Sequence, residues 1–220
     1  FIVMNRIVER KDLNDAPYIV SAGADRIMNG AGGVAYGRGD FSEGAANAYG
    51  IFRASEVYRD PVTDEVLGLE AKEIGLANVK SLEKDIVTLD LIKTTQQVKE
   101  GDRLLTTENR QLVARFQPKA PDDYVDGYII SVPGGVTQIG QYSMIVINKG
   151  TREGISEGSV LDIMKKGQTI RDRTKEEQVS LPSEKAGQLM VFRAYEKVSY
   201  ALVVKATRAL KVGDQVRSPF

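Results

Sequence analysis

Landmark segments in the first half of this chain return, in the same order, in the second half. Tyr18-Ile-Val-Ser-Ala22 returns as Tyr128-Ile-Ile-Ser-Val132, and Gly101-Asp102 returns as Gly213-Asp214. The offsets are 110 and 112 residues, so little is inserted or lost between the landmarks. A period this long corresponds to a whole domain and not to the short unit of a solenoid. The sequence therefore predicts two copies of one domain that arose by internal duplication.

Three further pairs of segments keep this order: Ser42-Glu-Gly44 with Ser156-Glu-Gly158, Arg59-Asp60 with Arg171-Asp172, and Leu67-Gly68 with Ala186-Gly187. The last pair lies 119 residues apart, which is a longer offset than the others. We therefore expect about seven residues to be gained in the second copy after this point and lost again before Val198.

Short runs of β-branched and aromatic residues, separated by glycine, proline and aspartate, predict strands in both copies. No segment keeps the periodicity of an amphipathic helix over three turns. The strands are expected at residues 18–22, 34–36, 48–53, 86–92, 128–132, 142–148, 159–164, 187–194 and 198–205. We therefore expect an all-β fold of two tandem, related small β-barrel or β-sandwich domains with an N-terminal arm.

The expected boundaries follow from composition. Residues 1–16 precede the first repeat and form an arm or linker, and residues 17–116 form the first β domain. Residues 117–126 form a linker, because Gln117 to Asp123 contains two prolines and two acids, which resist helix and central strand. Residues 127–220 form the second β domain.

The composition excludes several kinds of chemistry. The chain has no histidine and no cysteine, which removes Ser-His-Asp and Cys-His catalysis, imidazole and thiolate zinc sites, and disulfides. Carboxylate hydrolysis and a hard-cation site stay open. The net charge is zero, so no basic surface predicts nucleic-acid binding, and no apolar run reaches the length of a membrane span. We expect no catalytic residues, cofactor or metal.

The Gly-Asp segments are the sharpest local repeat: Val98-Lys-Glu-Gly-Asp-Arg-Leu104 and Leu210-Lys-Val-Gly-Asp-Gln-Val216. Glycine supplies the positive φ of a tight turn, and an aspartate can bond to the turn backbone. The pattern therefore favours structural turns over a catalytic role for Asp102 or Asp214.

Three other motifs have ordinary structural interpretations. Gly30-Ala-Gly-Gly matches the dinucleotide-binding pattern loosely, but the glycines that follow do not favour the required helix, so we expect a hairpin. Arg38-Gly-Asp40 spells an adhesion tripeptide that arises easily by chance in a turn. Arg59-Asp-Pro61 and Arg171-Asp-Arg173 predict local charge pairs at hairpin ends.

Several longer segments carry a resemblance to a known family: Val34-Ala-Tyr-Gly-Arg-Gly39, Tyr58-Arg-Asp-Pro-Val-Thr-Asp-Glu-Val-Leu-Gly-Leu-Glu-Ala71, Asn148-Lys-Gly150, Gly187-Gln-Leu-Met-Val-Phe-Arg193 and Val198-Ser-Tyr-Ala-Leu-Val203. Together they resemble the C-terminal region of LysM-domain periplasmic proteins, the type IV pilus secretin-associated protein family, which is similar to the C-terminal domain of the flagellar T-ring protein. The chain departs from the family pattern at Gly33, where we expect Asp.

The resemblance implies a non-enzymatic, cell-envelope-associated protein of the periplasm. Its implied partners are the outer-membrane pilus secretin, around which it would assemble as a ring, and peptidoglycan, bound by a LysM module outside this chain. The first residue is Phe1, so we expect a piece of a longer protein with any targeting signal upstream. The alternatives are a peptidoglycan-binding module without a secretin partner and a cell-wall hydrolase or its accessory.

The arm supplies the candidate partner-binding residues: Phe1, Ile2, Val3, Met4, Ile7 and Val8. These apolar side chains lie outside either repeat, and such an arm could add a strand to the open sheet edge of a partner. The other outcome is that the arm folds back on its own first domain.

Overall fold

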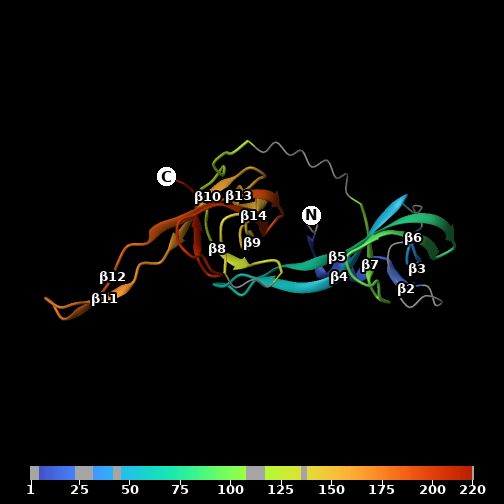
Figure 1. Cartoon of the computed structure of the whole chain (residues 1–220), viewed down its shortest axis with the longest axis horizontal. Helices are drawn as coiled ribbons and strands as arrows, with labels where there is room; N and C mark the ends of the chain where they lie inside the picture. The colour runs from blue at the N-terminus through green and yellow to red at the C-terminus, as the bar shows by residue number, and fades with distance from the viewer. Residues whose placement is uncertain (1–4, 23–31, 42–45, 108–116, 135–137, 220) are drawn as a thin grey trace. The chain divides into compact units, whose positions relative to one another are not determined.

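The computed structural model describes residues 5–22, 32–41, 46–107, 117–134 and 138–219, and the fold is all-β, as the sequence predicts (Figure 1). The chain divides into two compact units. The first unit contains residues 1–57 and 68–112, and the second contains residues 58–67 and 113–220. A short segment of the first half, residues 58–67, is therefore part of the second unit.

The first unit is built on a seven-stranded sheet. Its elements are β1 (Arg6–Val8), α1 (Arg10–Asp15), β2 (Tyr18–Ser21), β3 (Val34–Arg38), β4 (Ala48–Arg59), β5 (Val66–Glu83), β6 (Ile86–Thr94) and β7 (Arg103–Thr106). The strand order is β1-β5-β4-β7-β2-β3-β6, and β5 pairs additionally with β6. The pairings therefore run in a ring, β4-β5-β6-β3-β2-β7, with β1 attached to β5.

The second unit is built on a closed barrel in the order β10-β13-β14-β9-β8-β15. Its elements are β8 (Asp126–Ser131), β9 (Met144–Ile147), η1 (Thr151–Glu153), β10 (Val160–Lys165), β11 (Thr169–Asp172), β12 (Glu177–Ser180), β13 (Glu184–Ala194), β14 (Ser199–Ala206) and β15 (Gln215–Arg217). Strands β11 and β12 form a separate two-stranded sheet.

The two units have the same strand order when β2, β3, β4, β5, β6 and β7 are matched with β8, β9, β10, β13, β14 and β15. The register agrees as well. Gly75 pairs with Thr94 and Gly187 with Ala206, and both hairpins have their bulges at corresponding places. This correspondence is what the duplication hypothesis predicts.

The register also corrects one detail of the sequence comparison. Gly187 corresponds to Gly75, at the common offset of 112, and not to Gly68. A Cβ on either glycine would lie 2.5 Å from a carbonyl oxygen of the neighbouring strand, Lys93 O for Gly75 and Lys205 O for Gly187. Both positions need glycine because the backbones approach closely at a bulge. The expected insertion in this region is therefore wrong.

Each unit has its own apolar core. At corresponding positions, one core often has a large side chain where the other has a small one. Ala77 of the first core stands where the second has Leu189, whereas Leu89 stands where the second has Ala201. Volume-conserving exchanges of this kind keep a core close-packed. The same barrel can therefore form from two sequences that differ at most core positions.

Residues outside the expected strands are also ordered. Helix α1 was not expected, and its Leu13 packs against Phe52, Leu69 and Ala71. In the segment expected as a linker, Lys119 bridges to Ser159 and Val125 is buried in the core of the second unit. In the described part of the chain, no helix has the length and apolarity that crossing a membrane requires.

Candidate functional site

The segment 58–67 contains the turn between β4 and β5, and its sequence fixes its shape. The Asp60 carboxylate accepts hydrogen bonds from the backbone N–H groups of Val62 and Thr63, at 2.9 and 3.0 Å. The Asp60 N–H donates to the Glu65 carbonyl at 2.9 Å, and Asp64 adopts a positive φ of 59°. Aspartate forms such turns readily because its side chain replaces a backbone acceptor.

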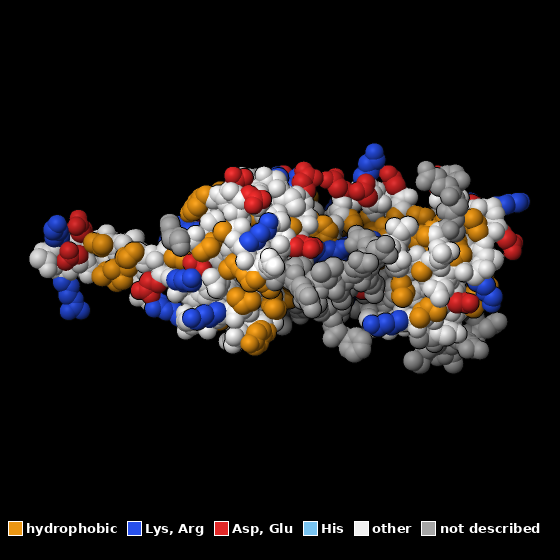
Figure 2. Space-filling view, turned by 90° about the horizontal axis from the view of Figure 1, so that it is seen from above, with side chains coloured by type: hydrophobic (Ala, Val, Ile, Leu, Met, Phe, Trp, Pro, Cys, Tyr) orange, Lys and Arg blue, Asp and Glu red, His pale blue; other side chains and the backbone are white. Residues whose placement is uncertain are grey.

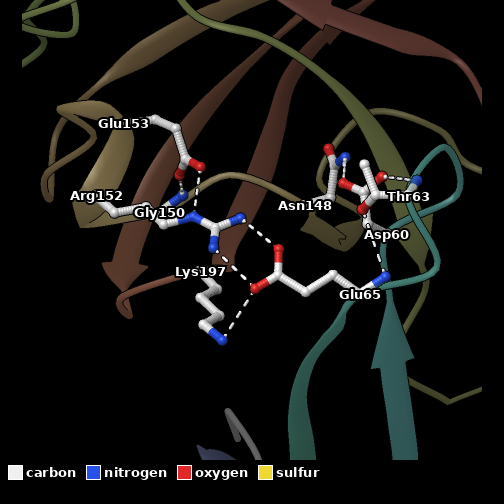
Figure 3. Close-up of polar contacts among 8 residues, drawn as sticks. All are labelled: Asp60, Thr63, Glu65, Asn148, Gly150, Arg152, Glu153 and Lys197. Carbon is white, nitrogen blue, oxygen red and sulfur yellow. Dashed lines mark hydrogen bonds and ion pairs between the residues drawn. The ribbon is translucent and has the colours of Figure 1, made fainter.

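A buried hydrogen bond connects this turn to the residue that follows β9. Asn148 donates from Nδ2 to the second carboxylate oxygen of Asp60 at 2.7 Å, and both residues are buried (Figure 3). The Asn148 Oδ1 accepts from the Tyr128 N–H at 2.6 Å. Burial raises the pKa of Asp60, but the hydrogen bonds from Thr63, Val62 and Asn148 outweigh it and hold that pKa below its ordinary value.

An ion-pair network holds the other end of the turn. Arg152 donates from both terminal nitrogens to the two Glu65 carboxylate oxygens, at 3.0 and 3.1 Å, and the Lys197 ammonium lies 3.0 Å from Glu65 Oε1 (Figure 3). The Arg152 hydrogen bonds, followed by that of Lys197, lower the pKa of Glu65 to about 2. Bidentate arginine–carboxylate pairs fix orientation as well as charge.

The guanidinium of Arg152 is itself positioned by a short 3-10 turn. The Arg152 Nε donates to Glu153 Oε1 at 2.6 Å, and the Gly150 N–H donates to Glu153 Oε2 at 2.8 Å. The hydrogen bonds to Glu65 and then to Glu153 raise the pKa of Arg152. We call the six residues Asp60, Glu65, Asn148, Arg152, Glu153 and Lys197 the clasp.

The clasp is suited to holding a chain segment rather than to acid–base chemistry. Its three carboxylates all accept hydrogen bonds from named donors, and the low pKa of Glu65 keeps that group ionised at neutral pH. A general acid needs a pKa near the working pH. Among the residues that the structure describes, no group of histidine, cysteine, aspartate or glutamate has an arrangement that could hold a metal ion.

The predicted Gly-Asp turns are confirmed. Gly101 and Gly213 have φ values of 85° and 89°. Asp102 accepts from the Lys99 N–H at 2.8 Å, and Asp214 accepts from the Lys211 N–H at 2.9 Å. Each buried carboxylate also forms an ion pair with the matched residue of its own unit, Arg53 for Asp102 and Lys165 for Asp214.

The candidate partner-binding residues fall in two groups. Phe1, Ile2, Val3 and Met4 lie outside the described residues. Ile7 and Val8 lie on β1, opposite Glu70 and Leu69 of β5, and Ile7 is buried. The described part of the arm therefore pairs with its own unit. A role of these residues in partner binding stays a prediction.

The other motifs are placed as follows. Arg38 forms an exposed ion pair with Asp85 at 2.8 Å, and Arg59 forms one with Asp64 at 3.3 Å. In the Gly30-Ala-Gly-Gly segment, Gly30 and Ala31 lie outside the described residues, and Gly32 and Gly33 directly precede β3. Sequence reasoning missed the clasp partners Asn148, Arg152 and Lys197, because no local pattern connects them with Asp60 and Glu65, which lie 87 to 132 positions earlier in the chain. Only the family resemblance singles out the segment Asn148-Lys-Gly150 in the sequence.

The molecule is thus an all-β protein in which a hairpin turn of the first half belongs to the second unit and is held there by the clasp. No family model matches the sequence. A search of curated proteins gives no match either.

The clasp gives the protein a defined response to acid. Because the pKa of Glu65 is about 2 when folded and ordinarily 4.5, the folded state binds fewer protons there. The stabilisation by Glu65 is therefore complete above pH 4.5 and is lost as the pH falls through 2. A carboxyl-carbon NMR titration should show Glu65 protonating near pH 2, and Glu65→Gln should remove that transition. The exposed Glu157→Gln variant should keep it; a Glu65 midpoint at the ordinary value of 4.5 would contradict the assignment.

Proposed function

We propose that this chain is a non-enzymatic interaction and anchoring protein of the periplasm that associates with the outer-membrane type IV pilus secretin. Peptidoglycan would be bound by a LysM module outside these 220 residues. The proposal begins from the family resemblance, of which the segment Tyr58 to Ala71 is the most specific part.

The observation that supports the proposal most is where this segment lies. Its Asp60 and Glu65 provide the first-half side of the clasp, and Asn148 of another resemblance segment provides part of the second-half side. The motif therefore has an architectural role, which is the role expected in a protein that presents surfaces to a partner.

The experiment is retention of purified secretin by the immobilised chain, in the absence of cell wall. We expect secretin to be retained. A matched variant in which Phe1, Ile2, Val3 and Met4 are all replaced by serine tests the arm without removing Ile7 and Leu13, which are buried in the first unit. Loss of retention in this variant alone would assign the contact to the arm. Failure of the unmodified chain to retain secretin would overturn the proposal.

One observation favours the alternative, a peptidoglycan-binding module. Tyr18 and Tyr36 are exposed on the neighbouring strands β2 and β3, where Tyr18 stands opposite Arg38. Exposed aromatic rings offer an apolar face with a polar tip, which suits stacking against a sugar. Binding of the chain to purified sacculi that is lost in Tyr36→Ala, together with no retention of secretin, would select this alternative.

A further inference from the structure

The hairpin β11–β12 of the second unit carries a copy of the turn that the clasp holds. Asp172 accepts from the N–H groups of Thr174 and Lys175 at 2.8 and 3.4 Å, as Asp60 does from Val62 and Thr63. Glu176 has a φ of 55°, which matches the 59° of Asp64. Asp172 pairs with Glu177, the counterpart of Glu65.

The two turns differ in their surroundings. The first is held by the clasp within the second unit, whereas β11 and β12 are exposed along almost their whole length and pair with each other. Figure 1 shows the hairpin extending away from its barrel, and Figure 2 shows hydrophobic side chains along it. Ile170 and Val179 stand opposite each other and are 44% and 37% exposed. A two-stranded hairpin is marginally stable in water by itself, so this one is suited to a partner.

The face that corresponds to the clasp in the first unit is also exposed. Arg38 corresponds to Asn148. Arg38 directly follows Gly37, which pairs with Ile19. In the same way, Asn148 directly follows Ile147, which pairs with Ile129. Asp85 stands in the place of Lys197, at the common offset of 112. The two residues form an ion pair with side chains that are 57% and 50% exposed. Exposed pairs contribute little stability, so exchanging partners here has a low cost.

The charge of the turn and the charge of the face that corresponds to it differ together between the two copies. The clasped turn has Pro61 and Thr63 beside its acids, and it meets the basic side chains of Arg152 and Lys197. The second turn has Arg173 and Lys175 at the matching positions, and the counterparts of Asn148 and Lys197 in the first unit are one base and one acid, Arg38 and Asp85. The acidic turn of residues 58–67 thus contacts basic side chains. The β11–β12 turn has side chains of both charges, and its corresponding face has both charges as well.

We propose that the β11–β12 turn docks on the Arg38–Asp85 face of a second copy of this chain. The Asp172 carboxylate accepts from the Arg38 guanidinium, Lys175 pairs with Asp85, and Ile170 and Val179 lose contact with water. The contact joins two different surfaces, so successive copies are added head to tail and either close into a ring or extend as a filament. This self-association does not depend on the secretin, and its test uses the chain alone.

Disulfide trapping suits this protein because the chain contains no cysteine. One copy carries Thr174→Cys at the turn, and a differently tagged copy carries Glu83→Cys, two residues before Asp85. The control copy carries Lys93→Cys near the other end of β6, about 20 Å away along the strand. Under mild oxidation we expect the 174–83 product to form at least tenfold faster than the 174–93 product. Equal rates would overturn the proposal.

Charge exchange gives an independent readout in sedimentation velocity. The unmodified chain should increase in average mass with concentration, and Asp172→Arg or Arg38→Asp alone should remain monomeric. The double variant Asp172→Arg/Arg38→Asp should restore association, because its turn and its face carry opposite charges again, with their signs exchanged. Arg38 is exposed and Asp172 belongs to an exposed hairpin, so both variants should fold, which circular dichroism checks. An unmodified chain that is monomeric at every concentration, with the hairpin binding only to other molecules, would also overturn the proposal.

Discussion

Gly150→Ala should destabilise the second unit by about 3 kcal/mol, at the upper end of the cost of overpacking. A Cβ at this buried position would overlap the carbonyl oxygens of Tyr195 and Glu196. These are backbone atoms, and they accept the hydrogen bonds from Thr151 and Arg152 that hold the 3-10 turn against residues 195 and 196. The turn and the added methyl cannot both be accommodated, so Arg152 should also lose its position against Glu65.

The measurement is urea unfolding followed by circular dichroism, with the Glu65 carboxyl resonance as the local readout. Gly140→Ala is the matched control in the same unit, because a Cβ there meets nothing within 4 Å and no positive φ is required. We expect that control to change stability by less than about 0.5 kcal/mol. Equal stability of the Gly150→Ala and Gly140→Ala variants would show that the clasp turn tolerates a side chain.

Asp102→Ala and Asp214→Ala should each destabilise their own unit by about 2 kcal/mol, because each leaves partly buried donors without their acceptor. Asp102 accepts from Arg53 at 2.7 and 2.8 Å, and this pairing raises the pKa of Arg53. Asp102 also accepts from the Lys99 N–H. Asp214 accepts from the Lys165 ammonium at 2.9 Å and from the Lys211 N–H. The loss should be larger for Asp102, because its arginine pair is bidentate.

Asparagine is the matched substitution at both sites, since its side-chain oxygen keeps the bond to the turn N–H while the charge and one acceptor oxygen are removed. Asp102→Asn and Asp214→Asn should therefore lose less stability than the alanine variants. Urea unfolding measures all four variants. A large loss in one unit and none in the other would contradict the structural correspondence of the two turns.

Much of the strand pattern could be predicted from the sequence because it is local. Alternating β-branched residues between turn signals indicated β2, β3, β6, β8 and β14 close to their observed bounds. The pattern failed where local and tertiary preferences differ. Strand β5 was missed, and Tyr142, expected to begin a strand, instead has a positive φ of 66°. Helix α1 is short, and its burial of Leu13 comes from contacts with distant residues.

The candidate site shows the same division. The sequence identified Arg59-Asp60 and Arg171-Asp172 as matching hairpin ends, and both aspartates do organise their turns. It gave no indication that Asp60 would be buried against Asn148 while Asp172 belongs to an exposed hairpin. That difference depends on contacts between residues 88 positions apart, which no local pattern encodes.

The sequence by itself determined the all-β class, the repeated order of turns and strands, and the need for glycine at Gly101 and Gly213, because these depend on backbone preferences of a few neighbouring residues. Only the tertiary structure decided the register that matches Gly75 with Gly187, the assignment of residues 58–67 to the second unit, and the clasp that holds them. Those features arise from burial and ion pairing between segments that are far apart in the sequence. Such contacts form only when the chain has folded, so no local pattern encodes them.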